Sequence, residues 1–276
     1  MPHSEPKQRD RLRNQPRVVI TGLGAVTPLG QGKDELWAGV LAGRSAVRRI
    51  SRFDASSFRS QIAAQVDEFS PCEELDPKHA KRMDRFSQFA LTAAQQAWHD
   101  AGLARADLDG ERVGVSVGSA LGGIALAEQE CGVFFNGGIR QVDPSLALSV
   151  FVGAAPCNTA IHFGFTGPAT GNGNSCASGT IAVGEAMRMI RRGEADVALA
   201  VGAEAPLAPL CFGSFALIRA MSTRNDEPEA ASRPFDRDRD GFVMAEGAAA
   251  LVLEREDQAL ARRPHLRRGA RLCAHQ

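Results

Sequence analysis

Short apolar segments spaced along the chain most constrain what it can fold into. Residues 17–24 (RVVITGLG), 112–120 (RVGVSVGSA) and 195–205 (ADVALAVGAEA) each form such a run. Near-continuous apolar runs of this length are typical of strands that are covered on both faces of a sheet. Residues 241–254 (GFVMAEGAAALVLE) indicate one more strand or a pair of strands. The sequence therefore predicts a sheet with both faces buried.

Helical patterns alternate with these strands. We expect helices at residues 33–43, 77–103 and 179–193. In the longest of them, Pro77 suits the first turn and Gly102 suits the position after the last. Its apolar residues recur at helical spacing and predict one small, buried face: Met83, Phe86, Ala90, Ala93, Ala94 and Ala97. Residues 44–77 read as irregular. Strands that alternate with helices predict an α/β fold.

Composition excludes several classes of partner. The chain has 276 residues, of which 44% are hydrophobic, and its 32 basic and 32 acidic residues cancel. We therefore expect no nucleic-acid partner and no anionic membrane surface as partner. No apolar run approaches the roughly 18 residues of a membrane span. Residues 1–16 are polar without an apolar core, which predicts a disordered tail rather than a signal peptide.

The six cysteines are scattered and form no C-x-x-C pair. This spacing argues against a zinc site and against a disulfide framework, so we expect no metal and a cytoplasmic, reducing location. They are Cys72, Cys131, Cys157, Cys176, Cys211 and Cys273.

Cys176 lies in the segment GNGNSCASGT, among residues with very small side chains. A helix is expected to begin near Ala177, so the helix dipole would stabilise a thiolate by roughly 0.3–2 kcal/mol and lower the thiol pKa. The small neighbours would let a carbonyl approach the sulfur and would leave backbone N–H groups free to bind an oxyanion. A buried, inert cysteine is the alternative interpretation.

Several segments, in this order, resemble the β-ketoacyl-acyl-carrier-protein synthases, and among them the elongating synthase II type. The resemblance runs from about Arg17 to about Ala270 and rests on the following stretches: VVITGLGAVTPLG (18–30), GP (167–168), the cysteine segment, AMSTRND (220–226) and SRPFDRDRDGFVMAEGAAALVLE (232–254).

The resemblance implies a thiolase-like fold, in which two similar α/β halves form five layers, αβαβα, usually in a homodimer. Residues 17–276 would be the N-terminal ketosynthase domain, with the C-terminal half absent. By motif position, Cys176 would be the nucleophile that takes an acyl group from acyl carrier protein, and its N–H would be one oxyanion donor. Leu121 and Phe215 fall where the family lines its acyl pocket, although both could equally be residues of the hydrophobic core with no role in substrate binding. The family needs no cofactor.

The chain also departs from the family pattern. Asn174 and Ser175 precede the cysteine where T-A-C is usual, and Ala245 and Ala249 replace common glycines. The family's two histidine motifs and its glycine-rich oxyanion loop do not occur in the sequence. None of the six histidines lies in such a motif: His3, His79, His99, His162, His265 and His275. We therefore expect acyl transfer to Cys176 without condensation, as in a fragment, frameshift or split-gene product.

Other functions remain open at this point. The main alternatives are a non-catalytic, synthase-like partner subunit and a thiolase acting on coenzyme A thioesters. The segments STRND (222–226) and RPFDRDRDGF (233–242) favour the carrier-protein branch. Three further patterns are incomplete. DRDRDG (236–241) lacks the final glutamate of a calcium loop, TGLGAV (21–26) lacks the third glycine of a dinucleotide site, and GNSCA (173–177) lacks the last glycine of a hydrolase elbow.

Overall fold

A six-stranded mixed sheet forms the centre of the computed structural model, which describes residues 15–263. The strand order is β2-β1-β9-β7-β5-β6. The strands are β1 (Val18–Thr27), β2 (Gly30–Gln31), β5 (Val113–Gly118), β6 (Ala169–Asn172), β7 (Val197–Glu204) and β9 (Gly247–Arg255). β5 runs parallel to both β6 and β7, whereas β9 is antiparallel to β7 and β1. The predicted tail lies outside the described residues, except for residues 15 and 16.

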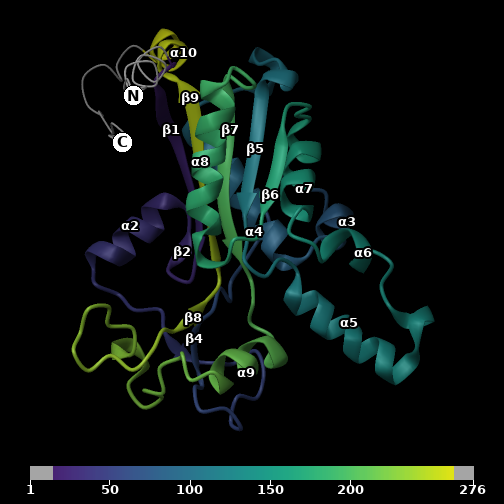
Figure 1. Cartoon of the computed structure of the whole chain (residues 1–276), viewed down its shortest axis with the longest axis vertical. Helices are drawn as coiled ribbons and strands as arrows, with labels where there is room; N and C mark the ends of the chain where they lie inside the picture. The colour runs from purple at the N-terminus through teal and green to yellow at the C-terminus, as the bar shows by residue number, and fades with distance from the viewer. Residues whose placement is uncertain (1–14, 264–276) are drawn as a thin grey trace, which may run out of the picture.

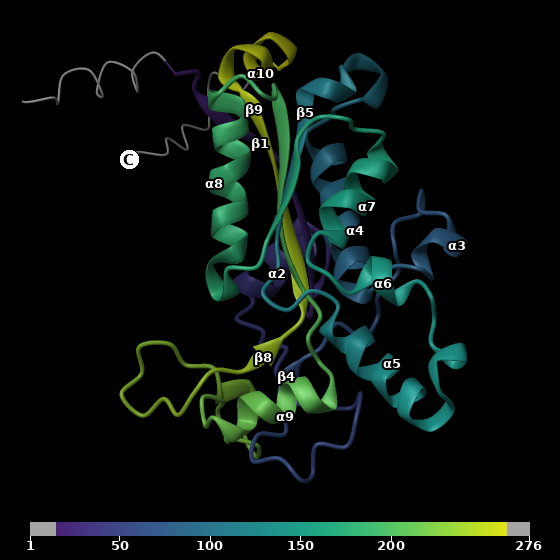
Figure 2. The ribbon, with the colours of Figure 1, turned by 45° about the vertical axis from the view of Figure 1, so that its right-hand side comes forward.

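Helices cover both faces of this sheet. Helices α4 (Arg85–Asp100) and α7 (Ala154–Phe163) lie on one face, and α8 (Ser178–Arg191) lies on the other (Figure 2). The small face predicted for the long helix is buried throughout, and Phe86, Ala90 and Ala97 are fully inaccessible. This arrangement confirms the expected α/β fold. The central strands β5 and β7 are buried on both faces, whereas Ile20 and Leu23 of β1 are exposed.

A second, smaller layer lies below the main sheet (Figure 1). It contains the three-stranded sheet β3-β4-β8 and helix α9, with their own apolar cluster around Phe212 and Met244. The bounds are β3 (Arg48–Arg49), β4 (Ile62–Ala64), β8 (Met244–Ala245) and α9 (Pro209–Leu217). A single residue separates β8 from β9, so one continuous segment of the chain runs from the smaller layer into the main sheet.

The remaining helices lie around these layers. None of the helices in residues 15–263 is long and apolar enough to cross a membrane. The helices are α2 (Lys33–Leu41), α3 (Pro77–Ala80), α5 (Ile124–Gly137), α6 (Leu146–Ser149) and α10 (Glu256–Arg262), with short 3-10 turns at Arg105–Asp107, Gly110–Arg112, Ile139–Gln141, Ser175–Ala177 and Pro228–Ala230.

Two local predictions were wrong. The single helix expected at 77–103 is divided into α3 and α4, because the Asp84 side chain accepts a hydrogen bond from the Phe86 N–H (2.8 Å) and starts a new helix. The segment 44–77, expected to be irregular, contains β3 and β4. The strand pair considered for 241–254 is confirmed as β8 and β9, which separate at Gly247, where φ is +154°.

Candidate active site

Cys176 lies on the 3-10 turn Ser175–Ala177 that leads directly into α8. Cys176 is exposed, which contradicts the burial that the alternative interpretation assumed. Ser175 has φ +51°, a left-handed conformation that is uncommon for a residue other than glycine. The N–H groups of Ala177 and Ser178 close the turn by donating to Asn174 and Ser175 carbonyls, and this leaves the Cys176 N–H outside these bonds.

Glycines beside the cysteine allow α8 to approach the sheet. A Cβ atom on Gly118, at the end of β5, would lie 2.1 Å from the Ser178 carbonyl oxygen. A Cβ on Gly202, in β7, would lie 3.2 Å from the Gly179 Cα. The small residues therefore have a packing role in addition to leaving the sulfur accessible, because they bring the start of α8 against two strand ends.

A cavity of about 560 Å³ opens beside Cys176 and brings the three predicted site residues together. Leu121 and Phe215 both line it, and both are half-buried. The Phe215 ring also packs edge to face on Phe242, with 6.0 Å between the ring centroids. Most of the remaining wall is apolar and comes from the ends of β1, β5 and β7 and from β8–β9. A cavity of this character suits an aliphatic chain attached at the sulfur.

Two carboxyl side chains in the cavity wall were not predicted. Glu246 is fully buried and pairs with Arg52, lies 3.7 Å from Arg85 Nε, and accepts from the Val66 N–H at 3.2 Å. It therefore joins the small layer to α4. The sequence signal was available, because a charged residue interrupts the apolar stretch 241–254.

The second is Glu204, at the end of β7. Its Oε1 accepts hydrogen bonds from Ser119 Oγ (3.1 Å) and from the Ala120 N–H. Burial raises the pKa of this carboxyl, and the hydrogen bonds to it oppose that rise only in part. An acidic residue at the end of the apolar run 195–205 was the signal that could have identified it.

None of the residues lining this cavity, all within the described part of the chain, is a histidine. His162 lies on α7, across the sheet from α8, and burial lowers its pKa. His99 lies on α4 with its Nε2 3.3 Å from Glu74 Oε1. His79 lies on α3. His3, His265 and His275, like Cys273, are outside the described residues.

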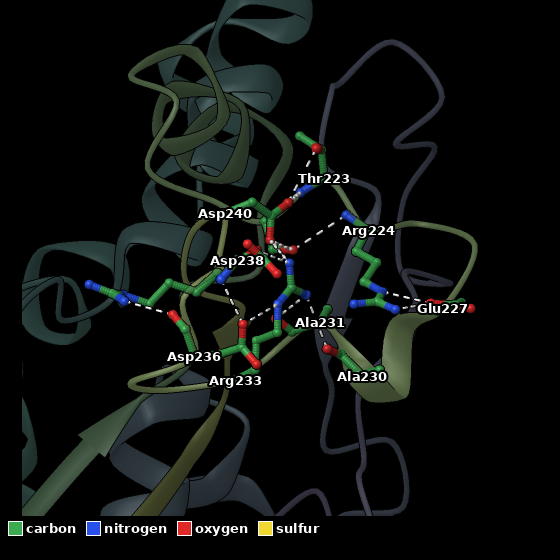
Figure 3. Close-up of polar contacts among 11 residues, drawn as sticks. Thr223, Arg224, Glu227, Ala230, Ala231, Arg233, Asp236, Asp238 and Asp240 are labelled. Atoms are coloured by element: carbon green, nitrogen blue, oxygen red, sulfur yellow. Dashed lines mark hydrogen bonds and ion pairs between the residues drawn. The ribbon is translucent and has the colours of Figure 1, made fainter.

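Asp–Arg contacts hold the charged turn at 236–241 (Figure 3). Arg233 Nη2 lies 3.2 Å from Asp240 Oδ1, and Arg237 Nε lies 3.3 Å from Asp238 Oδ1. Asp240 also accepts from Ser222 Oγ (2.7 Å) and the Thr223 N–H (2.9 Å). These bonds hold residues 222 and 223 against Asp240, which lies two positions before the cavity-lining Phe242. Within residues 15–263, no group of three or more His, Cys, Asp or Glu side chains could hold a metal ion.

Comparison with known proteins agrees with this geometry. Residues 15–259 match the family described as "Beta-ketoacyl synthase, N-terminal domain". The chain is 44% identical over 243 residues to 3-oxoacyl-[acyl-carrier-protein] synthase 2 of Coxiella burnetii, covering 88% of this chain and 59% of that protein. It is 44% identical over 264 residues to actinorhodin polyketide putative beta-ketoacyl synthase 1 of Streptomyces coelicolor, covering 94% and 55%.

A solved structure is similar as well. It is a type II PKS acyl-carrier protein in complex with its ketosynthase bound to the hexaketide, with a TM-score of 0.77, 35% identity, and coverage of 90% of this chain and 60% of that one. The chain thus spans less than two thirds of the length of these relatives, over the N-terminal part of a thiolase-like fold. The layered sheet and the cysteine at the start of a helix agree with this sequence match. The chain belongs to the β-ketoacyl synthase family.

Proposed function

We propose that this chain carries the acyl-accepting part of a 3-oxoacyl-[acyl-carrier-protein] synthase of fatty acid or polyketide synthesis, with Cys176 as the nucleophile. The Cys176 thiolate attacks the thioester carbonyl of an acyl carrier protein, the new C–S bond forms, and the phosphopantetheine thiolate leaves. The proton lost from the Cys176 thiol is taken up by the departing thiolate. An acyl-enzyme and a free carrier thiol result.

One observation supports this role above the others: the exposed sulfur of Cys176 lies at an apolar cavity that Leu121 and Phe215 also line. A thioester exchange needs an accessible nucleophile, space for the acyl chain and a donor for the oxyanion. The Cys176 N–H, left out of the bonds that close its turn, is placed beside the sulfur and can serve as one donor. The exposed cysteine also favours this reading over a non-catalytic partner subunit.

Acyl carrier protein is the proposed partner. The similar ketosynthase structure contains a carrier protein bound to its ketosynthase, and the name of the Coxiella burnetii relative specifies a 3-oxoacyl group on acyl carrier protein. We further propose that residues 17–276 act as one N-terminal ketosynthase domain in the cytoplasm. The five described cysteines are all free, which suits a reducing compartment.

The test is acylation of the purified chain by octanoyl-acyl carrier protein, followed by intact-mass and peptide mapping. We expect one octanoyl adduct, located on Cys176, and no adduct on Cys176→Ala. Cys157→Ala, which removes another exposed thiol on α7, is the matched control and should acylate like the wild type. Acylation that persists in Cys176→Ala would refute the assignment.

We also propose that the chain forms a homodimer through the free edge of β6. Within residues 15–263 this strand bonds only to β5, and Ala169, Thr170 and Gly171 are exposed. Large exposed apolar side chains lie on the helices that precede β6, among them Phe135, Leu148 and Ile161. An open strand edge next to apolar surface is a ready template for pairing with a second chain.

Light scattering during gel filtration tests this proposal. The wild-type chain should elute at the mass of a dimer, and Ala169→Pro should shift it toward monomer, because Ala169 pairs opposite Val115 with its N–H turned to the free edge and proline removes that backbone donor. Ala169→Val keeps the strand and is the control. A monomeric wild type across micromolar concentrations would contradict the proposal.

A further inference from the structure

The Glu204 carboxyl is a part of the cavity wall that the acyl transfer proposed above does not use. Oε1 accepts from Ser119 Oγ at 3.1 Å and from the Ala120 N–H. Oε2 is shielded from solvent and has no hydrogen-bond partner among the described residues. The hydrogen bonds of this carboxyl therefore all go to the turn that begins at Ser119.

That turn, residues 119–122, holds Leu121 against the cavity. Ser119 Oγ accepts in turn from the Gly122 N–H at 2.9 Å, so the turn is bonded on both sides of Leu121. Gly122 has φ +55°, and a Cβ atom there would lie 3.0 Å from the Val150 carbonyl oxygen. The backbone on which Leu121 is carried therefore has one well-defined position while Glu204 holds it.

The same bonds continue to the cysteine. The Ser119 N–H donates to the Asn172 carbonyl (3.1 Å), and Asn172 Nδ2 donates to the Ser178 carbonyl (3.1 Å). Ser178 Oγ then donates to the Ser175 carbonyl (2.6 Å), within the turn that carries Cys176. Glu204 is thus the first member of a hydrogen-bond chain that links the acyl-pocket turn to the nucleophile turn across the ends of β7, β5 and β6.

The other carboxyl in the wall provides a contrast. Glu246 is compensated by two arginines and fixes the two layers to each other. Glu204 has no ion-pair partner within residues 15–263, and its partners are backbone and hydroxyl dipoles. The hold on the turn therefore depends on a side-chain oxygen that accepts from Ser119 Oγ and the Ala120 N–H, and not on pairing with a cation.

We propose that Glu204 is a positioning residue that fixes Leu121 relative to Cys176 and thereby sets which acyl chain lengths the cavity accepts. This inference rests on the proposed acyl transfer to Cys176. A pocket residue that moves by a fraction of an ångström changes discrimination between chains more than it changes the reactivity of the sulfur itself.

The experiment compares acylation rates of the full chain by octanoyl- and hexadecanoyl-acyl carrier protein, read by intact mass. Glu204→Ala should change the ratio of the two rates by about tenfold, the scale of a lost methylene contact. Its rate of Cys176 labelling by iodoacetamide should stay within about twofold of the wild-type rate. Leu121→Ala should change the ratio of the octanoyl and hexadecanoyl acylation rates in the same direction as Glu204→Ala does. Glu204→Gln retains an oxygen acceptor for Ser119 and Ala120 and should restore the wild-type ratio.

Glu185→Ala is the matched control, because it removes a glutamate on α8 that pairs with Arg188 outside the cavity; its ratio should equal the wild-type ratio. An unchanged ratio in a folded Glu204→Ala chain would overturn the inference, as would a shifted ratio in Glu204→Gln. If circular dichroism shows that Glu204→Ala is unfolded, Ser119→Ala decides, since it breaks the same link and leaves the carboxyl in place. A wild-type chain that takes no acyl group would refute the proposed function instead.

Discussion

Cys176 and Cys211 show how strongly the local environment can separate two thiols in one chain. Cys211 is buried near the start of α9, and burial raises its pKa to about 11, helped by the nearby carboxylates Glu128 and Glu204. At pH 7 such a thiol has almost no thiolate, which is the reactive form. Cys176, in contrast, is exposed on the turn that leads into α8, where a reagent can reach it.

We therefore expect limiting iodoacetamide at pH 7 to label Cys176 before the other thiols and Cys211 last. Peptide mass mapping after short exposures measures this order. Preference for Cys131 or Cys157, which are exposed on α5 and α7, would contradict the assignment of the nucleophile.

At the scale of the element, Asp84 connects helix formation to pH. Its side chain caps α4, and burial raises its pKa from 3.8 to about 6, while Arg85 lowers it and Glu246 raises it further. A carboxyl whose pKa is raised by folding binds its proton more tightly in the folded state. The free energy of unfolding should therefore fall as pH rises from about 4 to about 6, by about 3 kcal/mol from this group.

Urea unfolding of wild type and Asp84→Asn at several pH values tests this. Asparagine also caps a helix but does not titrate, so the difference in unfolding free energy between the two chains should change across this pH window and be constant outside it. A difference that stays constant from pH 4 to pH 7 would show that Asp84 does not titrate in this way.

The elements differ in how well the sequence predicts them, and the reason is burial. Residues 112–120 and 195–205 became β5 and β7 because strands covered on both faces need continuous apolar residues. Residues 17–24 became part of β1, although Ile20 and Leu23 there are exposed. The sequence did not predict β6, whose residues Ala169–Asn172 are mostly exposed at the sheet edge and carry no apolar pattern. The three-residue β4 is too short for any periodicity to appear.

The site was predictable to a similar extent. A motif identified Cys176, Leu121 and Phe215, and all three line one cavity. Glu204 and Glu246 were missed because their roles depend on partners far away in sequence, such as Ser119 and Arg52. No local pattern contains such pairings, since they arise only when strand ends meet.

For the whole molecule, the composition of the cavity limits the chemistry. Condensation with malonyl-acyl carrier protein would need acid–base groups near Cys176, and the ionisable side chains of the cavity wall are Cys176, Glu204 and Glu246. Loss of one positioned acid–base group costs about 10²–10⁴ in rate. We expect the 276-residue chain to form an acyl thioester at Cys176 but to release no 3-oxoacyl product.

Product analysis by mass spectrometry, after incubation with both carrier-protein substrates, checks this expectation. The adduct on Cys176, absent from Cys176→Ala, shows in the same sample that the first half-reaction is intact. Robust 3-oxoacyl formation would contradict it and would direct attention to the cavity carboxyls, because α7, which carries His162, lies on the other face of the sheet from α8 (Figure 2).

The pairing of β1 with β9 also has a consequence for the time course of synthesis. Val18 pairs with Arg255 and Val26 with Ala248, and β9 lies between β1 and β7 in the sheet. A ribosome adds roughly 5–20 residues per second, so the first strand waits on the order of 10–50 s for its neighbour to emerge. During that interval the nascent chain exposes an unpaired apolar strand, and chaperone engagement at residues 18–27 should persist until β9 leaves the exit tunnel.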